Sequence, residues 1–158
     1  MFLASAILLF SVALFFFYLQ ATCEKVLARQ FGQEYFQSIV DANRLEFPYV
    51  RKVLEEFDKS VDYPWVRLTL ECDFLALTYL LKAAANARGR YTGQERLLMF
   101  YFRAIFFCLF RVGLFKLREK SALLKLTDIL QHFADLIGER LSNLQSGQQT
   151  ASEYLLTL

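Results

Sequence analysis

Four arginines in one apolar segment are spaced so that a helix would carry them on one side. Arg96, Arg103, Arg111 and Arg118 follow each other at intervals of 7, 8 and 7 residues. At about 100° per residue, their side chains fall within an arc of about 80°. Arginine offers a rigid fork of hydrogen-bond donors to carboxylates and phosphates. We call these four residues the arginine stripe.

Phenylalanine is concentrated in the same segment, where Phe100 and Phe107 alternate with the arginines. The chain has 17 phenylalanines among 158 residues, more than a small helical core requires. Because excess apolar surface marks interaction sites, we expect the arginine stripe, Phe100 and Phe107 to dock a partner or lipid head groups. The alternative is a solvated face, along which the arginine stems cover apolar surface and keep their charges in water.

Two carboxylates interrupt the apolar stretch from Leu68 to Leu81. Glu71 and Asp73 would be costly to bury there without partners, and Arg67 lies one helical turn before Glu71. We therefore predict that Arg67, Glu71 and Asp73 take part in buried ion pairing. An enzyme that uses Glu71, Asp73 or His132 is the less favoured hypothesis.

A second group of ionisable residues lies near the end of the chain. Asp128, His132, Asp135 and Glu139 would lie within about 60° of each other on a helix, opposite a face of leucine, isoleucine and phenylalanine. This pattern is typical of an amphipathic helix whose polar face is solvated. The alternative is that its carboxylates pair with the arginine stripe.

Most catalytic and cofactor-binding arrangements are excluded by what the sequence contains. His132 is the only histidine, which excludes bis-histidine haem ligation and histidine-rich zinc or di-metal sites. The three cysteines are far apart and form no C-x-x-C pair, and no phosphate-binding loop or G-x-S-x-G motif is present. A net charge of +2 with interspersed signs argues against nucleic-acid binding. We expect no catalysis, metal or cofactor; a mononuclear metal on Asp128, His132 and Asp135 is a remote alternative.

Residues 1–23 carry no charged side chain, and Phe2 to Leu19 is almost wholly apolar. At about 1.5 Å per residue, some 20 such residues cross the roughly 30 Å hydrocarbon core of a bilayer. A cleaved signal peptide would begin with basic residues and have a shorter apolar core. Lys25 and Arg29 follow the segment, so the positive-inside rule predicts an outward amino terminus and a cytoplasmic remainder.

The rest of the chain has the spacing of helices and lacks the alternation typical of strands. Residues 24–46 are expected to extend the anchor as one long helix that Pro48 ends. Residues 47–144 are expected to form a helical bundle, and residues 145–158 a polar tail. The bundle helices are predicted at residues 49–59, 63–88, 95–120 and 121–144, with start or stop signals at Asp62, Gly89, the capping box Thr92-Gly93-Gln94-Glu95, and Ser121.

The sequence therefore predicts an all-α protein in which one N-terminal transmembrane helix continues into a small cytoplasmic bundle of about four helices. A second span at residues 95–120 is disfavoured, because each arginine near the bilayer centre costs about 2.5 to 3.5 kcal/mol. We expect that helix to be central and buried, or docked on the membrane surface or on a partner.

The leading functional hypothesis is a non-catalytic accessory or structural subunit of a larger membrane protein complex, for which a respiratory or photosynthetic complex is one conceivable host. Its partners would be other subunits of that complex and the lipid bilayer. The alternative hypothesis is a membrane-tethered regulator or adaptor that binds a soluble cytoplasmic partner.

Overall fold

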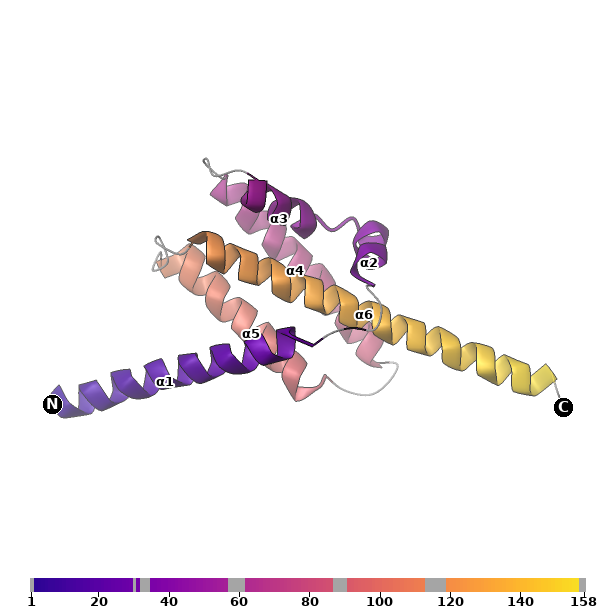
Figure 1. Ribbon diagram of the computed structural model, residues 1–158, viewed down its shortest axis with the longest axis horizontal. Coiled ribbons are helices and arrows are strands. Elements are labelled where there is room, and N and C mark those ends of the chain that lie inside the picture. The colour runs from indigo at the N-terminus through magenta and orange to yellow at the C-terminus, as the bar shows by residue number, and fades with distance from the viewer. Residues whose placement is uncertain are drawn as a thin grey trace.

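The computed structural model describes residues 2–29, 31, 35–56, 62–86, 91–112 and 119–156, and for residues 2, 85, 86, 111, 112 and 146–156 the backbone alone. The regular secondary structure in these ranges is helical throughout, as predicted. The elements are α1 (Phe2–Leu27), α2 (Phe36–Asn43), α3 (Phe47–Glu56), α4 (Tyr63–Asn86), α5 (Gly93–Phe107), the π-helical turn η1 (Cys108–Val112) and α6 (Glu119–Leu156). Figure 1 shows α2 to α6 grouped together, while α1 and the end of α6 project to opposite sides.

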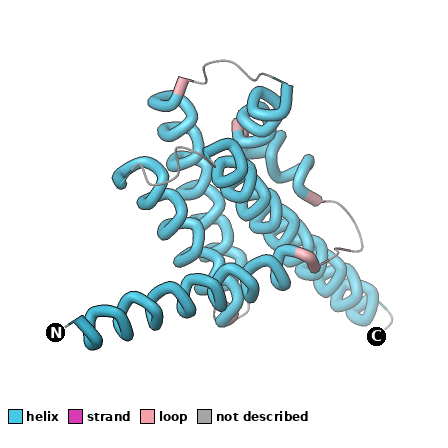
Figure 2. The backbone as a smooth tube through the Cα atoms, turned by 60° about the vertical axis from the view of Figure 1, so that its left-hand side comes forward, coloured by secondary structure: helices cyan, strands magenta, loops and turns pink. Residues whose placement is uncertain are grey.

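Helix α1 is almost wholly apolar and meets the other helices only near its end. Every side chain from Leu3 to Tyr18 is exposed, whereas Leu19 and Cys23 are buried. Within the described part of the chain, Leu3–Leu27 is the one helix long and apolar enough to cross a bilayer. Figures 1 and 2 show α1 passing beside α5 and leaving the group of helices on one side. A long exposed apolar helix is thus attached to the bundle through a short docking segment.

The expected extension of the anchor through residues 24–46 is wrong. Helix α1 ends at Leu27, and a separate helix, α2, begins at Phe36. Contacts with α6 are made between them: Arg29 pairs with Glu139 at 3.1 Å, and Asp135 accepts hydrogen bonds from backbone N–H groups. Local periodicity could not account for these contacts, because the partners lie about 100 residues farther along the chain.

Two predicted helix starts are confirmed, and a third is shifted. Helix α4 begins directly after Asp62, and α5 has the predicted capping box, in which Thr92 and Glu95 each bond the other's backbone N–H. Helix α3 begins at Phe47, because Pro48 fits the first turn of a helix, where its missing N–H has no helical partner. The predicted ends near Lys59, Arg88 and Gly89 lie outside the described residues.

The predicted helix over residues 95–120 is interrupted. Helix α5 ends at Phe107, and the backbone continues as the π-helical turn η1, whose i→i+5 bonding changes the rotation per residue. A stripe extrapolated at about 100° per residue therefore holds for α5 and not beyond it.

Helix α6, rather than the phenylalanine-rich segment, is the centre of the fold. It contacts each of the other five α-helices. It begins at Glu119 and continues to Leu156, through the segment predicted as a polar tail. The tail contains several good helix formers, and a single glycine such as Gly147 costs a helix only about 1 kcal/mol.

Both faces of α6 are covered by other elements. Its leucine-rich face forms the core with α4 and α5, and on the opposite face His132 and Asp135 are buried beside the chain that follows α1. The expectation of a solvated polar face is therefore wrong for these two residues. Asp128 and Glu139 stay partly exposed.

Contacts between phenylalanine rings connect the three longest bundle helices. The rings of Phe74 on α4 and Phe102 on α5 are parallel with centroids 4.1 Å apart, and Phe133 on α6 lies 6.5 Å from Phe74. Phe106 and Phe110 continue the contact along α5 and η1. Part of the unusual phenylalanine content is thus core packing, and another part is exposed on α1.

Gly138 on α6 allows the chain after α1 to approach the helix closely. A Cβ atom at this position would lie 2.2 Å from Cβ of Tyr35, well inside van der Waals contact. Tyr35 is held there because its backbone N–H donates to Asp135 at 3.0 Å. The junction between α1 and α2 therefore requires glycine at position 138.

We expect Gly138→Ala to lower the free energy of unfolding by about 1 to 3 kcal/mol, because overpacking at Tyr35 outweighs the gain in helix propensity. Gly93→Ala is the matched control, since no atom lies within 4 Å of its added Cβ, and it should change stability by less than about 1 kcal/mol. Denaturant unfolding of both variants in detergent, followed by circular dichroism, measures the difference. Equal stability of the two variants would contradict the close approach.

Candidate functional site

A groove between α4 and α5 gathers residues from both predicted sites. Arg67, Glu71 and Leu75 line it from α4, and Arg103 and Phe107 line it from α5. Its volume is about 360 Å³. The rings of Phe74, Phe102, Phe106 and Phe110 complete its lining. We call this feature the α4–α5 groove.

The part of the arginine stripe that falls on α5 is exposed and alternates with phenylalanine. Arg96, Phe100, Arg103 and Phe107 lie within about 60° of each other on the helix, and all four are exposed. Phe100 and Phe107 each keep more than half of their surface exposed, at 52% and 58%. The side chain of Arg111 and the whole of Arg118 lie outside the described residues.

The guanidinium groups of this surface have no carboxylate partner among the described residues. Arg67, Arg96 and Arg103 form no ion pair there, although Glu71 lines the same groove as two of them. Arg103 instead lies over the ring of Phe74, with its guanidinium carbon 5.8 Å from the ring centroid. These cations are therefore available to a carboxylate from another molecule.

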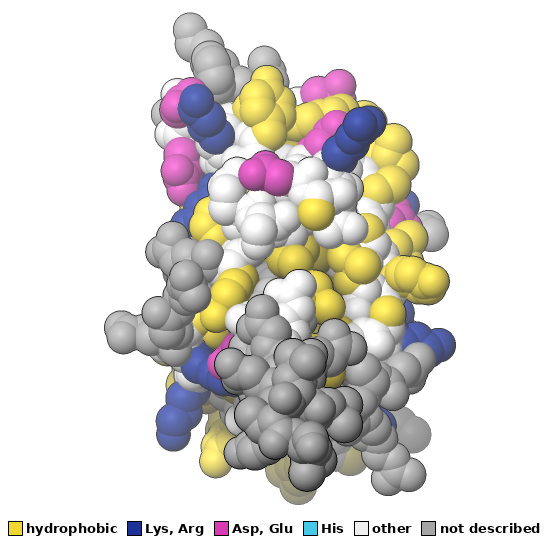
Figure 3. Space-filling view, turned by 90° about the vertical axis from the view of Figure 1, so that its right-hand side faces the viewer, with side chains coloured by type: hydrophobic (Ala, Val, Ile, Leu, Met, Phe, Trp, Pro, Cys, Tyr) yellow, Lys and Arg dark blue, Asp and Glu magenta, His cyan; other side chains and the backbone are white. Residues whose placement is uncertain are grey.

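Exposed apolar side chains also occur outside α1 and α5. Leu68, Leu75 and Tyr79 form one exposed row on α4. Figure 3, which views the end of the molecule from which α6 projects, shows hydrophobic side chains near the middle of that face and charged ones toward its top and sides. The bundle thus offers mixed apolar and charged surface in addition to the apolar helix α1.

The structure gives Asp73 a different partner from the predicted ion pairs. Its carboxylate is buried and accepts hydrogen bonds from the backbone N–H groups of Glu46 at 2.9 Å and Phe47 at 2.6 Å, so it caps α3. Burial raises the pKa of Asp73 above its ordinary value, and the two N–H groups oppose that rise. Glu71 is exposed, and no ion pair joins Arg67, Glu71 and Asp73 within the described chain.

Two carboxylates of α6 pair with basic residues outside the arginine stripe, and none pairs with Arg96 or Arg103 within the described chain. Arg51 of α3 reaches Asp128 at 2.7 Å, and Arg29 reaches Glu139 at 3.1 Å. In the opposite sense, Lys125 of α6 donates to Glu24 of α1 at 2.8 Å. Sequence reasoning missed Arg51 and Arg29 because they precede their partners in α6 by 77 and 110 residues and share no helix face with each other.

Asp135 holds the chain between α1 and α2. Its Oδ1 accepts hydrogen bonds from the backbone N–H of Tyr35 at 3.0 Å and of Phe36 at 2.8 Å, at the start of α2. Its neighbour His132 packs against Phe31, with ring centroids 5.2 Å apart. We call Glu24, Arg29, Phe31 and Tyr35, together with Lys125, His132, Asp135 and Glu139 of α6, the α1–α6 junction.

The carboxylates proposed as metal ligands are thus engaged elsewhere, Asp128 with Arg51 and Asp135 with the backbone of α2. Among the described residues, no group of three histidine, cysteine, aspartate or glutamate side chains is placed to hold a metal ion.

Comparison of the chain with protein-family models, curated proteins and solved structures gives no match.

Stability should fall on acidification, because burial, aided by the guanidinium of Arg29, lowers the pKa of His132 to about 4. In the unfolded chain His132 binds a proton near pH 6.5, whereas in the folded chain it stays neutral down to about pH 4. The free energy of unfolding therefore falls as the pH falls from about 6.5 toward 4. The loss between pH 7 and pH 5 should be on the order of 1 to 2 kcal/mol.

Denaturant midpoints at pH 7 and pH 5 measure this loss, and His132→Gln, which cannot titrate, is the matched variant. Its unfolding free energy should change less over this pH interval than that of the wild type. If both proteins lose stability in parallel, His132 is not the responsible group.

Proposed function

We propose that the chain is a non-catalytic accessory subunit of a membrane protein complex, anchored by α1 and docked to its neighbour through the α4–α5 groove. One observation carries this proposal: the groove combines exposed apolar side chains with guanidinium groups that have no carboxylate partner in the described chain. Exposed aromatic and arginine side chains are the residues that dominate binding energy at protein interfaces.

The partner that fits the groove is an apolar helix bearing a carboxylate. Leu75 and Phe107 would contact its apolar side chains, and Arg103 would bind its carboxylate. Covering Arg103 without such a partner would leave a desolvated charge, which is strongly unfavourable. An anchor in the same bilayer would raise the effective concentration of another membrane subunit, which favours that class of partner over a soluble one.

The orientation that we propose is amino terminus out and bundle in the cytoplasm. Lys25 and Arg29 follow the apolar run, and the fold adds Arg51 and Lys125 near the same end of α1. Basic residues at one end of a span favour the cytoplasmic side. Exposed residues such as Lys52 on α3 would then face the cytoplasm.

We expect Arg103→Glu to remove the chain from its complex, because it places a like charge opposite the partner's carboxylate. In extracts made with a mild detergent, native electrophoresis should show the wild type in a band much larger than the monomer. The fraction in that band should fall at least about tenfold in the variant, a change of about 1.4 kcal/mol or more.

Lys52→Glu is the control, because it makes the same charge reversal on an exposed residue that does not line the groove. It should leave the large band unchanged. Recovery of the wild type as a lone monomer would overturn the accessory-subunit proposal. Retention of a soluble protein after high-salt washing of the membranes would favour the adaptor hypothesis instead.

The orientation is tested with Lys52→Cys in a background of Cys72→Ser and Cys108→Ser, where the remaining Cys23 is fully buried. A membrane-impermeant maleimide should label this cysteine only after the cells are permeabilised. The same background without the new cysteine should stay unlabelled. Labelling in intact cells would place the bundle outside.

A further inference from the structure

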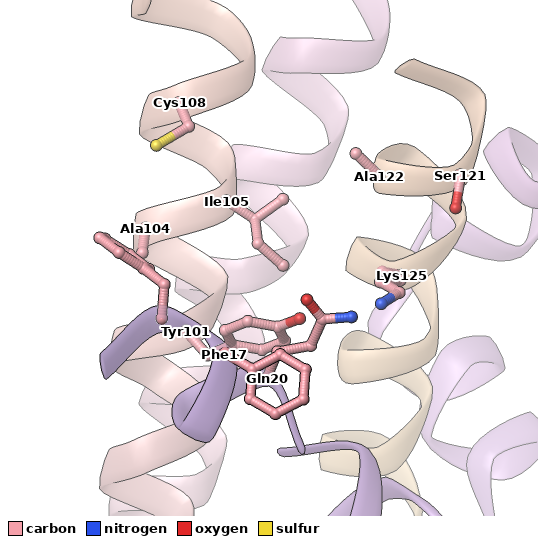
Figure 4. A pocket seen from close by; sticks show the side chains of 10 residues that line it. Phe17, Gln20, Tyr101, Ala104, Ile105, Cys108, Ser121, Ala122 and Lys125 are labelled. Atoms are coloured by element: carbon pink, nitrogen blue, oxygen red, sulfur yellow. The ribbon is translucent and has the colours of Figure 1, made fainter. Parts of the chain in front are cut away.

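Two adjoining pockets meet where α1 leaves the bundle, and they differ in chemistry. The first pocket has a volume of about 500 Å³ and lies between α1, α5 and the start of α6 (Figure 4). It is lined mainly by apolar atoms, and its lining residues include Phe16, Phe17, Ala104, Ile105 and Ala122. The second, about 510 Å³, lies among the charged side chains of the α1–α6 junction. Tyr101 and Lys125 line both pockets.

The apolar pocket shares a wall with the candidate membrane span. Phe16, Phe17 and Gln20 belong both to the span Leu3–Leu27 and to the lining of the pocket. Phe17 keeps 70% of its surface exposed, so the pocket is continuous with the exposed apolar face of α1. A pocket that opens beside a membrane span is accessible to the acyl chains of the surrounding lipid.

Polar groups lie where the two pockets meet. Figure 4 shows Gln20 and Lys125 at one end of the apolar pocket, on either side of the gap between α1 and α6. Lys125 donates to Glu24 at 2.8 Å, and Gln20 donates to the same carboxylate oxygen at 3.0 Å. The apolar volume therefore ends at a paired cation and anion.

The charges that line the polar pocket are balanced. Its cations are Arg29, Arg51 and Lys125, and its anions are Glu24, Asp128 and Asp135. A head group that carries only negative charge would meet these three carboxylates. A head group with both an ammonium and a phosphate can approach one charge of each sign, as electrostatic complementarity requires.

We propose that the two pockets together bind one zwitterionic glycerophospholipid. One acyl chain lies in the apolar pocket between α1 and α5, the phosphate contacts Lys125, and the ammonium contacts Glu24. An acyl chain in a bilayer or a micelle is already out of water, so retention through mild extraction depends on packing of the chain in the pocket and on the head-group contacts. The inference rests on the proposed anchoring of α1 in a bilayer and is independent of the α4–α5 groove.

The test is native mass spectrometry of the full chain after mild detergent extraction. The wild type should retain about one phospholipid per chain, and Ala104→Phe, which fills the apolar pocket, should reduce the retained lipid at least about fivefold. Ala83→Phe is the control, because Ala83 is exposed on α4 and does not line the pocket, and it should retain lipid like the wild type. Ser121→Phe fills the same pocket from α6 and serves if Ala104→Phe does not fold by circular dichroism.

Incubation of the delipidated protein with vesicles tests the head group. Uptake from phosphatidylethanolamine or phosphatidylcholine vesicles should exceed uptake from phosphatidylglycerol vesicles. Lys125→Ala should reduce the uptake of the two zwitterionic lipids. Preferential uptake of phosphatidylglycerol, absence of lipid from the wild type, or equal retention by Ala104→Phe would each overturn the proposal. Sedimentation of the chain with membranes is measured in parallel. A chain that does not sediment would contradict the proposed anchoring, whereas a membrane-bound chain that retains no lipid would contradict only the proposed lipid site.

Discussion

The fold depends on how the charged face of α6 holds the chain that leaves α1. Asp135 accepts backbone hydrogen bonds from Tyr35 and Phe36, and the absence of a side chain at Gly138 lets that segment lie against the helix. Arg29 and Lys125 add ion pairs on either side. Exposed ion pairs contribute little individually, so the buried carboxylate at Asp135 is the interaction that orders the junction.

The α1–α6 junction also determines the direction of α1 and the position of the two pockets beside it. Because α1 docks through Leu19 and Cys23 and is held again after Leu27, its exposed apolar part leaves the bundle in one direction. The apolar pocket and the charged pocket are two sides of this attachment and share Tyr101 and Lys125. The α4–α5 groove is built separately, on phenylalanine rings, so the proposed partner docking and the proposed lipid binding can be altered independently.

Features set by short stretches of sequence were predictable. The apolar helix α1, the capping box at Thr92 and the exposed row of arginine and phenylalanine on α5 each depend on residues a few positions apart. The break between α1 and α2 and the role of Asp73 could not be predicted. In each case a carboxylate on another helix accepts hydrogen bonds from backbone N–H groups distant in sequence. The amphipathic pattern of α6 predicted that His132 and Asp135 are solvated. Both are buried, because the chain between α1 and α2 covers them.

The most direct measurement of the central claim is hydrogen exchange at the start of α2. With Asp135 replaced by alanine, the amides of Tyr35 and Phe36, followed in a peptide that contains both residues in its interior, should exchange at least about tenfold faster, because a buried hydrogen bond to a charged group contributes on the order of 1.5 to 3 kcal/mol. Glu56→Ala, at an exposed position on α3, should leave that peptide unchanged. Exchange in Asp135→Ala at the wild-type rate would contradict the account that α6 holds the chain after α1 to the bundle.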